Sequence, residues 1–233
     1  GRRDPGGALG AAGPRAPLGV RAASRVIVTE DEARAYVAGL TDAEGMKRLE
    51  AFVVLVLEEN QRQNLIAKAT EPHIWQRHIA DSAQLLENVS RETLGANAGG
   101  PWLDLGSGPG FPGLVIAALC PNMPVVLVES RARRAEFLQS AVAALDLHKC
   151  RVEGQRLERV TPFAARAISA RAFAPLPKLL ELSAPFSTSA TRYVLPKGRS
   201  AAQELEALKP SIRAMFHVKH SLTDPDAGII VKA

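Results

Sequence analysis

A run of alternating glycines follows an acidic residue near the middle of the chain. The stretch 102–113 reads WLDLGSGPGFPG, in which Asp104 ends the apolar part and three glycines follow, Gly106, Gly108 and Gly110. Glycines in a turn between a strand and a helix let the backbone approach a ligand closely, because no Cβ intervenes. We therefore expect a ligand to lie against this turn.

A second acidic residue, Glu129, follows the apolar run 125–128. A carboxylate at the end of a strand suits the two hydroxyl groups of a ribose. The glycine turn and Glu129 together predict a nucleoside-type cofactor that lies across the strand ends of an α/β sheet. A glycine turn without a ligand is the alternative, and Glu129 at the next strand end argues against it.

The glycine spacing separates two kinds of nucleoside cofactor. The dinucleotide pattern G-x-G-x-x-G admits a pyrophosphate at a helix N-terminus, but Phe111 occupies the position of its last glycine here. Asp104 would repel a pyrophosphate, whereas it would suit the positive charges of S-adenosylmethionine. The pattern D-x-G-x-G-x-G resembles motif I of the class I methyltransferases. We therefore expect S-adenosylmethionine rather than NAD(P), with Asp104, Gly106, Gly108, Gly110 and Glu129 around it.

Composition limits the remaining possibilities. The chain has 233 residues, a net charge of +5 and two cysteines, Cys120 and Cys150, whose positions in apolar patterns indicate reduced core thiols. No apolar run approaches the roughly 20 residues that span a membrane, so we expect a cytoplasmic protein without a membrane partner. Residues 1–25 and 101–233 are basic and residues 26–100 acidic, which is compatible with an anionic substrate such as RNA.

The N-terminal part of the chain divides into a tail and a helical cap. Residues 1–24, rich in Gly, Pro, Ala and Arg, are predicted to be a disordered tail; a cleaved targeting peptide or a misassigned start are alternatives. Residues 25–95 are predicted to form the helical cap. Capping boxes at Thr29 and Thr41 begin helices that end near residues 40 and 63, and a third helix covers 72–87. A linker follows at 88–100.

From residue 96 to 233 the pattern alternates between strands and helices. Strands are predicted at 102–105, 124–128, 150–154, 165–170, 191–195, 212–219 and 228–232, with helices at 112–119, 131–145, 175–183 and 200–208. This order predicts an α/β fold, a class I (Rossmann-like) methyltransferase domain with a mostly parallel seven-stranded sheet and helices on both faces. The last two strands resemble the antiparallel hairpin that ends a methyltransferase sheet.

The end of the fourth strand bears on the chemistry of the target. Residues 168–173 read ISARAF and offer no amide-Pro-Pro-aromatic motif, no cysteine nucleophile and no acid. We infer a target atom that is already nucleophilic and needs no general base. Guanine N7, with its exposed lone pair, meets this requirement, and positioning would then supply most of the catalysis.

Several short motifs occur in a fixed order along the chain, and together they resemble one family. They are NLI at 64–66, RHIADS at 77–82, the glycine turn, Ser169 with 171–173, and LPKG at 195–198. Over roughly residues 41–233 the chain resembles the RsmG (GidB) family. The resemblance implies an enzyme that transfers the methyl group of S-adenosylmethionine to N7 of one guanine, guanine 527, of 16S rRNA in the small ribosomal subunit. Nothing in the sequence suggests an obligate dimer, so we expect a monomer.

Two other functions remain open. A ribosome-assembly factor that binds RNA could keep the methyltransferase fold without turnover, although the intact glycines and Glu129 argue against decay. An NAD(P)-linked oxidoreductase is the more distant alternative, which Asp104 and Phe111 oppose.

The resemblance also assigns cofactor contacts. It places them at Gly106, Phe111, Leu157, Glu158 and Arg171. We expect Phe111 to cover the apolar part of the cofactor, and Leu157 and Glu158 to meet the adenine edge. Glu158 is alternatively a helix-start acid that the helix dipole favours.

Four residues are expected at the reacting end of the site: Asn64, His78, Arg171 and Lys197. Arg171 and Lys197 would orient the guanine, Lys197 through a phosphate or O6. As alternatives, Arg171 pairs with Glu129 or Glu158, Lys197 is solvated in a turn, and Asn64 only hydrogen-bonds in a loop. His78 shares a helix face with Asp81 and lines the methionine end of the cofactor site or the interface between the cap and the sheet.

A rim of arginines could follow the RNA backbone: Arg131, Arg133, Arg134, Arg156 and Arg159.

Overall fold

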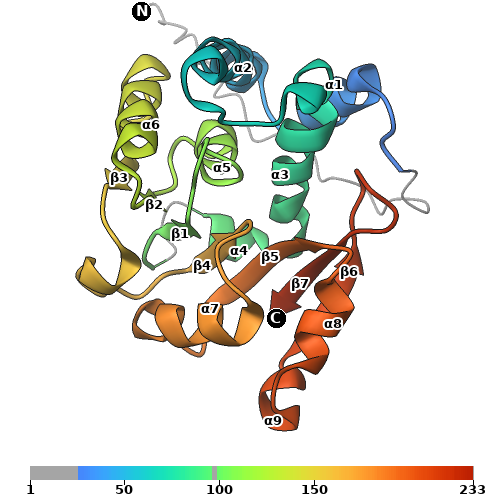
Figure 1. The fold of residues 1–233 in the computed structure, drawn as a ribbon, viewed down its shortest axis with the longest axis vertical. Helices are drawn as coiled ribbons and strands as arrows, with labels where there is room; N and C mark the ends of the chain where they lie inside the picture. The colour runs from blue at the N-terminus through green and yellow to red at the C-terminus, as the bar shows by residue number, and fades with distance from the viewer. Residues whose placement is uncertain (1–25, 96–98, 233) are drawn as a thin grey trace, which may run out of the picture.

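Short apolar runs that end at polar or small residues form one seven-stranded sheet (Figure 1). The structure, a computed structural model, describes residues 26–95 and 99–232, so the predicted disordered tail 1–24 lies outside the described residues. The strands are β1 (Trp102–Leu105), β2 (Val125–Val128), β3 (Cys150–Glu153), β4 (Ala167–Ala170), β5 (Arg192–Gly198), β6 (Phe216–His220) and β7 (Gly228–Lys232).

The strand order is β3-β2-β1-β4-β5-β7-β6. Strands β1 to β5 are parallel, β7 is antiparallel to β5, and β6 is antiparallel to β7. The predicted mostly parallel sheet and its closing hairpin are therefore confirmed. Because the five parallel strands end at the same edge, the residues that follow them meet there.

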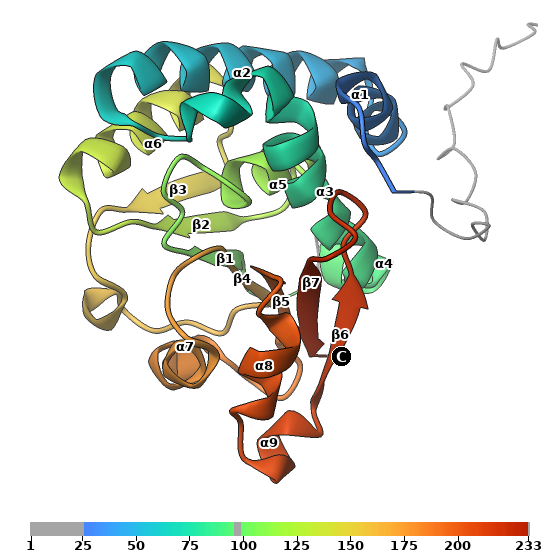
Figure 2. The same cartoon turned by 45° about the vertical axis from the view of Figure 1, so that its right-hand side comes forward.

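Helices cover both faces of the sheet (Figures 1 and 2). On one face lie α2 (Ala43–Gln63), α5 (Gly113–Leu119) and α6 (Ala132–Ala144), and on the other lie α7 (Leu176–Ser183) and α8 (Ala201–Glu206). The remaining helical segments are α1 (Glu30–Ala38), η1 (Lys68–His73), η2 (Trp75–Ala80), α3 (Asp81–Ala83), η3 (Gln84–Asn88), α4 (Arg91–Leu94), η4 (Leu157–Arg159), η5 (Ala184–Phe186) and α9 (Pro210–Arg213). No helix in the described part of the chain is long and apolar enough to cross a membrane.

The alternation of side chains along the strands produces two hydrophobic layers. Trp102 packs with the N-terminal helices in one cluster, whereas its neighbour Leu103 packs in the other cluster with Leu176 and Leu179 of α7. The first cluster extends from Ile27 to Val231. The N-terminal helices and the sheet therefore share one core.

The ends of the first two helices show one confirmed prediction and one error. Thr29 and Glu32 form the predicted capping box at α1. The N-cap of α2 is Asp42 rather than Thr41, because the Asp42 side chain accepts a hydrogen bond from the N–H of Gly45. Both residue types cap helices well, so the sequence pattern did not separate them.

Two other elements differ from their predicted form. The helix expected at 72–87 is a series of short 3₁₀, π and α segments, in which Pro72 lies inside η1 and supplies no N–H for an α-helical bond. The strand expected from residue 212 begins at Phe216, because Pro210 begins the short helix α9.

Candidate functional site

The glycine turn is held in place by Asp104, the last polar residue of β1. One carboxylate oxygen accepts a hydrogen bond from the Gly113 N–H at 3.1 Å, and the other accepts one from Ser169 Oγ of β4 at 2.6 Å. Asp104 is 0% exposed, and burial raises the pKa of its carboxyl to about 6. The expectation that Asp104 contacts the cofactor is therefore corrected: its carboxylate is enclosed by the protein and positions the turn.

The turn itself uses backbone conformations that favour glycine. Gly106, Gly108 and Gly110 have φ angles of 64°, 54° and 98°. A Cβ on Gly110 would lie 2.6 Å from Leu114 Cδ1 and 2.9 Å from Phe52 Cζ. These glycines are thus needed for the path of the chain and for the close packing of α2 and α5 behind the turn.

Glu129 joins the turn to the end of β2. Its carboxylate accepts hydrogen bonds from the N–H of Gly108 at 2.9 Å and of Arg131 at 2.8 Å. Unlike Asp104, Glu129 lines an open cavity of about 380 Å³, together with Gly106, Leu157 and Glu158. The sequence predicted these four residues as cofactor contacts, and the structure brings them together at one cavity.

A second cavity of about 300 Å³ adjoins the first. Gly106 and Ala172 line both of them, so the two form one cleft along the strand ends. Cavities of this size suit small-molecule ligands. Backbone N–H groups, the Glu129 carboxylate and the apolar side chain of Leu157 are the groups that a nucleoside would need, so the residues fit S-adenosylmethionine.

His78 and Phe111 lie side by side where the N-terminal helices meet the glycine turn. Their rings stack with centroids 4.9 Å apart, and Phe111 also packs on Phe52 at 5.3 Å. Phe111 is only 2% exposed. Its ring packs between His78 and Phe52, and Phe111 also lines the second cavity, so its expected role as a cover for the cofactor stays a prediction.

His78 is electrically neutral in this environment. Burial, with the nearby Arg171 and Arg77, lowers the pKa of its imidazole to about 3. Nδ1 lies 3.1 Å from Arg171 Nη1 and Nε2 lies 2.9 Å from Thr70 Oγ1. Because arginine can only donate, Nδ1 accepts and the proton resides on Nε2.

Arg171 occupies the centre of the site. It lines the second cavity and two further cavities, one beside Lys197 and one beside Asp81. Its described partner is His78, so the alternative that it pairs with Glu129 or Glu158 is not what the structure shows. The next residue, Ala172, has a φ of 52°, a strained conformation for a residue with a Cβ.

Lys197 differs most from its prediction. Its ammonium group lies 2.9 Å from Glu204 and donates to the carbonyl of Ala174 at 2.9 Å, and its side chain is 6% exposed. It therefore holds the segment after β4 in place, and it is not the solvated lysine of the alternative. Lys197 also lines a cavity with Arg171, so its expected contact with the RNA stays a prediction. Glu204 was not among the predicted site residues; the available signal was an acid in the first turn of the helix that follows β5.

The structure places the other predicted residues around the rim of the cleft. Asn64 ends α2 with a φ of 28° and is exposed, and the residues that follow it, rather than Asn64 itself, line the second cavity. Asp81 accepts hydrogen bonds from Thr223 and Gln84, which joins the cap to the β6–β7 hairpin. Of the predicted arginines, three line the first cavity: Arg131, Arg134 and Arg156.

The strand order, the glycine turn and the cleft at the strand ends define a class I methyltransferase fold. The solved fibrillarin/Nop5p complex has a similar fold, with a TM-score of 0.50, 13% sequence identity, and coverage of 67% of this chain and 81% of that chain.

Comparisons of the sequence identify the family. The family model GidB, rRNA small subunit methyltransferase G, matches residues 45–225. A protein named ribosomal RNA small subunit methyltransferase G from Erythrobacter litoralis is 57% identical over 88% of this chain and 97% of its own length. Another from Novosphingobium aromaticivorans is 56% identical over 88% of each. The chain belongs to the rRNA small subunit methyltransferase G family. This membership confirms the predicted resemblance, the enzyme class and S-adenosylmethionine as the methyl donor.

Proposed function

We propose that the protein methylates N7 of a single guanine, guanine 527 of 16S rRNA, within the small ribosomal subunit. The observation that carries the proposal is the continuous cleft at the strand ends, which brings Gly106, Glu129, Leu157 and Glu158 to one side of Arg171 and leaves further cavities on its other side. A cofactor on one side and a base on the other would then meet at Arg171.

The cofactor-side residues would hold S-adenosylmethionine, which supplies a methyl group on a positively charged sulfur. Glu129 would accept hydrogen bonds from the ribose hydroxyls, and the backbone near Leu157 would meet the adenine edge. His78 remains a proposed contact at the methionine end of the cleft, and Asn64 a proposed contact of the RNA where the cap meets the cleft. Among the rim arginines, Arg131, Arg134 and Arg156 are suited to the phosphates of the RNA backbone.

Titratable groups near the reacting end support a target that needs no base. The cavities that Arg171 lines include His78, whose pKa is about 3, and three acids that already have partners. Glu204 is bound to Lys197, Asp81 to Thr223 and Gln84, and Asp224 to Arg77. Guanine N7 has a free lone pair, so it can attack the methyl carbon directly while the carbon–sulfur bond breaks and its electron pair returns to sulfur. The enzyme would then contribute mainly by positioning the two partners.

The test is methyl transfer from labelled S-adenosylmethionine to small subunits from cells that lack the modification. We expect label in 7-methylguanosine after digestion of the rRNA to nucleosides. Label in another nucleoside would contradict the choice of N7. Cofactor binding without any transfer would favour the alternative, a non-catalytic assembly factor. The same assay with naked 16S rRNA shows whether the assembled subunit is required. The monomeric state and the cytoplasmic location of the protein stay predictions.

A further inference from the structure

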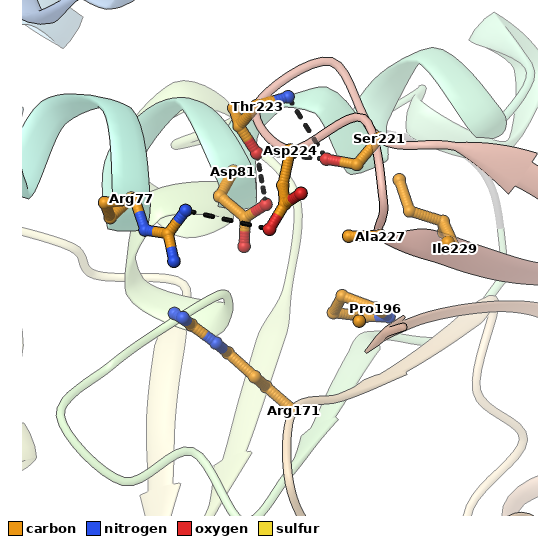
Figure 3. Close-up of a pocket in the computed structure, with 11 residues that line it drawn as sticks. Arg77, Asp81, Arg171, Pro196, Ser221, Thr223, Asp224, Ala227 and Ile229 are labelled. Atoms are coloured by element: carbon orange, nitrogen blue, oxygen red, sulfur yellow. Dashed lines mark hydrogen bonds and ion pairs between the residues drawn. The ribbon is translucent and has the colours of Figure 1, made fainter. Parts of the chain in front are cut away.

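A small cavity lies where the β6–β7 hairpin meets the N-terminal helices (Figure 3). We call it the hairpin pocket; it has a volume of about 180 Å³, and its principal lining residues are Arg77, Asp81, Arg171, Pro196, Asp224 and Ile229. This volume is less than half that of the 380 Å³ cavity beside Glu129. The hairpin pocket is therefore suited to a single base rather than to a whole cofactor.

Asp81 presents an acceptor to this pocket. One of its oxygens, Oδ1, accepts hydrogen bonds from Thr223 Oγ1 at 2.6 Å and from Gln84 Nε2 at 2.9 Å. Figure 3 shows the second oxygen turned away from Thr223 and toward the interior of the pocket. The two donors thus fix the orientation of the Asp81 carboxylate, so that its second oxygen faces a ligand in the hairpin pocket.

Two arginines bring donors to the pocket. Arg171 lies below Asp81, and Arg77, one helix turn before Asp81, lies 3.7 Å from Asp224 (Figure 3). Only one guanidinium nitrogen of Arg171 has a described bond, to His78, and arginine has five N–H donors. Arg171 also lines the cleft proposed for the cofactor, so the pocket and the cleft are neighbours.

The remaining wall is apolar. Pro196 of β5, Ala227 and Ile229 line it, and Figure 3 shows them on the side away from the two arginines. An apolar wall between polar groups suits the flat face of an aromatic base, while the base edges meet the carboxylate and the guanidinium groups.

We propose that the hairpin pocket binds the target guanine and that Asp81 recognises its Watson–Crick edge. This inference rests on the proposed function and names the residue that would select the base. Guanine offers donors at N1 and N2, which a carboxylate accepts, whereas adenine has an acceptor at N1 that a carboxylate repels. Asp81 would therefore favour guanine over adenine.

The orientation that follows suits methylation at N7. The N2 amino group and N7 lie on opposite edges of guanine, and O6 lies beside N7. A base held at N1 and N2 by Asp81 therefore turns N7 away from Asp81, toward Arg171 and the cofactor cleft. Arg171 is then placed to donate to O6, and Thr223 and Gln84 act as positioning residues for the carboxylate.

The experiment compares two substrates, small subunits reconstituted with 16S rRNA that carries either guanine or inosine at the target position. Inosine retains N7, N1–H and O6 but lacks the N2 amino group. We expect the wild-type protein to prefer guanine in kcat/KM by about 10-fold or more, as for a charged hydrogen bond. In Asp81→Asn the rate on guanine falls by about 10- to 100-fold, and the preference for guanine over inosine disappears.

The comparison contains its own controls. The ratio of the rates on the two substrates does not depend on the fraction of folded protein, so a partial folding defect in Asp81→Asn leaves it readable. Asp226→Asn makes the same chemical change in the hairpin that faces Asp81, at an exposed residue paired with Arg199, and should keep the wild-type ratio. Binding of S-adenosylmethionine should be unchanged in both variants.

The outcomes separate this inference from the function on which it rests. If Asp81→Asn keeps the wild-type preference for guanine, the inference is overturned and N7 methylation by the wild-type protein still stands. If the wild-type protein forms no 7-methylguanosine in guanine-containing subunits, the proposed function is overturned and this inference fails with it.

Discussion

Glu129 is the residue on which the proposed cofactor site depends most. Its carboxylate holds the N–H groups of Gly108 and Arg131 and borders the cavity that would receive the ribose. In Glu129→Gln a charged acceptor is replaced by an amide, one end of which can only donate. We expect the affinity for S-adenosylmethionine to fall by about 10- to 100-fold, measured by calorimetry.

A matched control lies at the end of the neighbouring strand. Glu153 ends β3 and pairs with Arg151. Glu153→Gln should bind the cofactor as the wild-type protein does. Equal affinities for all three proteins would contradict the assignment of Glu129.

The neutral state of His78 leads to a second prediction at this scale. Its pKa is lowered from 6.5 to about 3, mainly by burial, so the folded protein binds no proton there at neutral pH. The His78 ring resonances should stay constant between about pH 5 and 8 in NMR spectra, the range in which an ordinary histidine titrates. Because the unfolded chain takes up this proton below about pH 6.5, His78 destabilises the fold as the pH falls toward 3.

A titration of the His78 resonance near pH 6.5 in the folded protein would contradict this picture and would make the residue available as a general base. In concentrated urea the same ring should titrate normally, which provides the internal reference for the measurement.

The identities of single residues in the sequence predicted part of the proposed cofactor site. Gly106, Glu129, Leu157 and Glu158 follow different strands, and the parallel sheet brings them to one cavity as expected. Asp104, Phe111 and Lys197 also contact residues from other parts of the chain that the pattern around them does not reveal: Ser169, Phe52 and Ala174. A linear pattern shows that an acid follows a strand but does not show which groups surround it.

At the scale of the elements, the site depends on how closely α5 approaches β1 and β2. Gly113 begins α5, and a Cβ there would collide with Leu127 and lie 2.6 Å from Asp104 Oδ2. Gly113→Ala should therefore push the helix away from both strands. We expect a loss of about 1–3 kcal/mol in the free energy of unfolding, measured with urea, as for overpacked cores.

Gly99→Ala is the control for this substitution, because a Cβ at Gly99 has no atom within 4 Å. It should leave the free energy of unfolding close to the wild-type value. If Gly113→Ala were equally harmless, the close approach of α5 to the strands would not be needed to hold the glycine turn.

The order and type of the elements were largely predictable, whereas their ends were not. Alternating strands and helices predicted the sheet and both helical layers, since burial on both faces makes a strand such as β2 apolar throughout. The errors fall where two local signals compete. Asp42 rather than Thr41 caps α2, and Pro210 begins a short helix that covers the first part of the strand predicted at 212–219.

At the scale of the whole molecule, the N-terminal helices and the sheet form a single core. The two tryptophans of the chain lie on either side of the predicted boundary between 25–95 and 96–233: Trp75 in η2 is 4% exposed, and Trp102 in β1 is 0% exposed. Both belong to the same hydrophobic cluster. The cap and the sheet should therefore unfold together.

Single-tryptophan variants test this expectation. Trp102→Phe leaves Trp75 as the probe of the cap, and Trp75→Phe leaves Trp102 as the probe of the sheet. For each variant, the fluorescence transition in urea should coincide with the loss of far-UV circular dichroism, as in two-state unfolding. A Trp75 transition that precedes the loss of the overall secondary structure would instead show that the cap unfolds independently.

The proposed enzyme methylates one guanine, and borohydride–aniline cleavage maps N7-methylguanine directly in rRNA. Small subunits that lack the modification are incubated with the protein and S-adenosylmethionine, and the cleaved 16S rRNA is mapped by primer extension. We expect a single new stop next to guanine 527, absent when the cofactor is omitted. Methyl transfer without a new cleavage site, or cleavage at several guanines, would contradict the account.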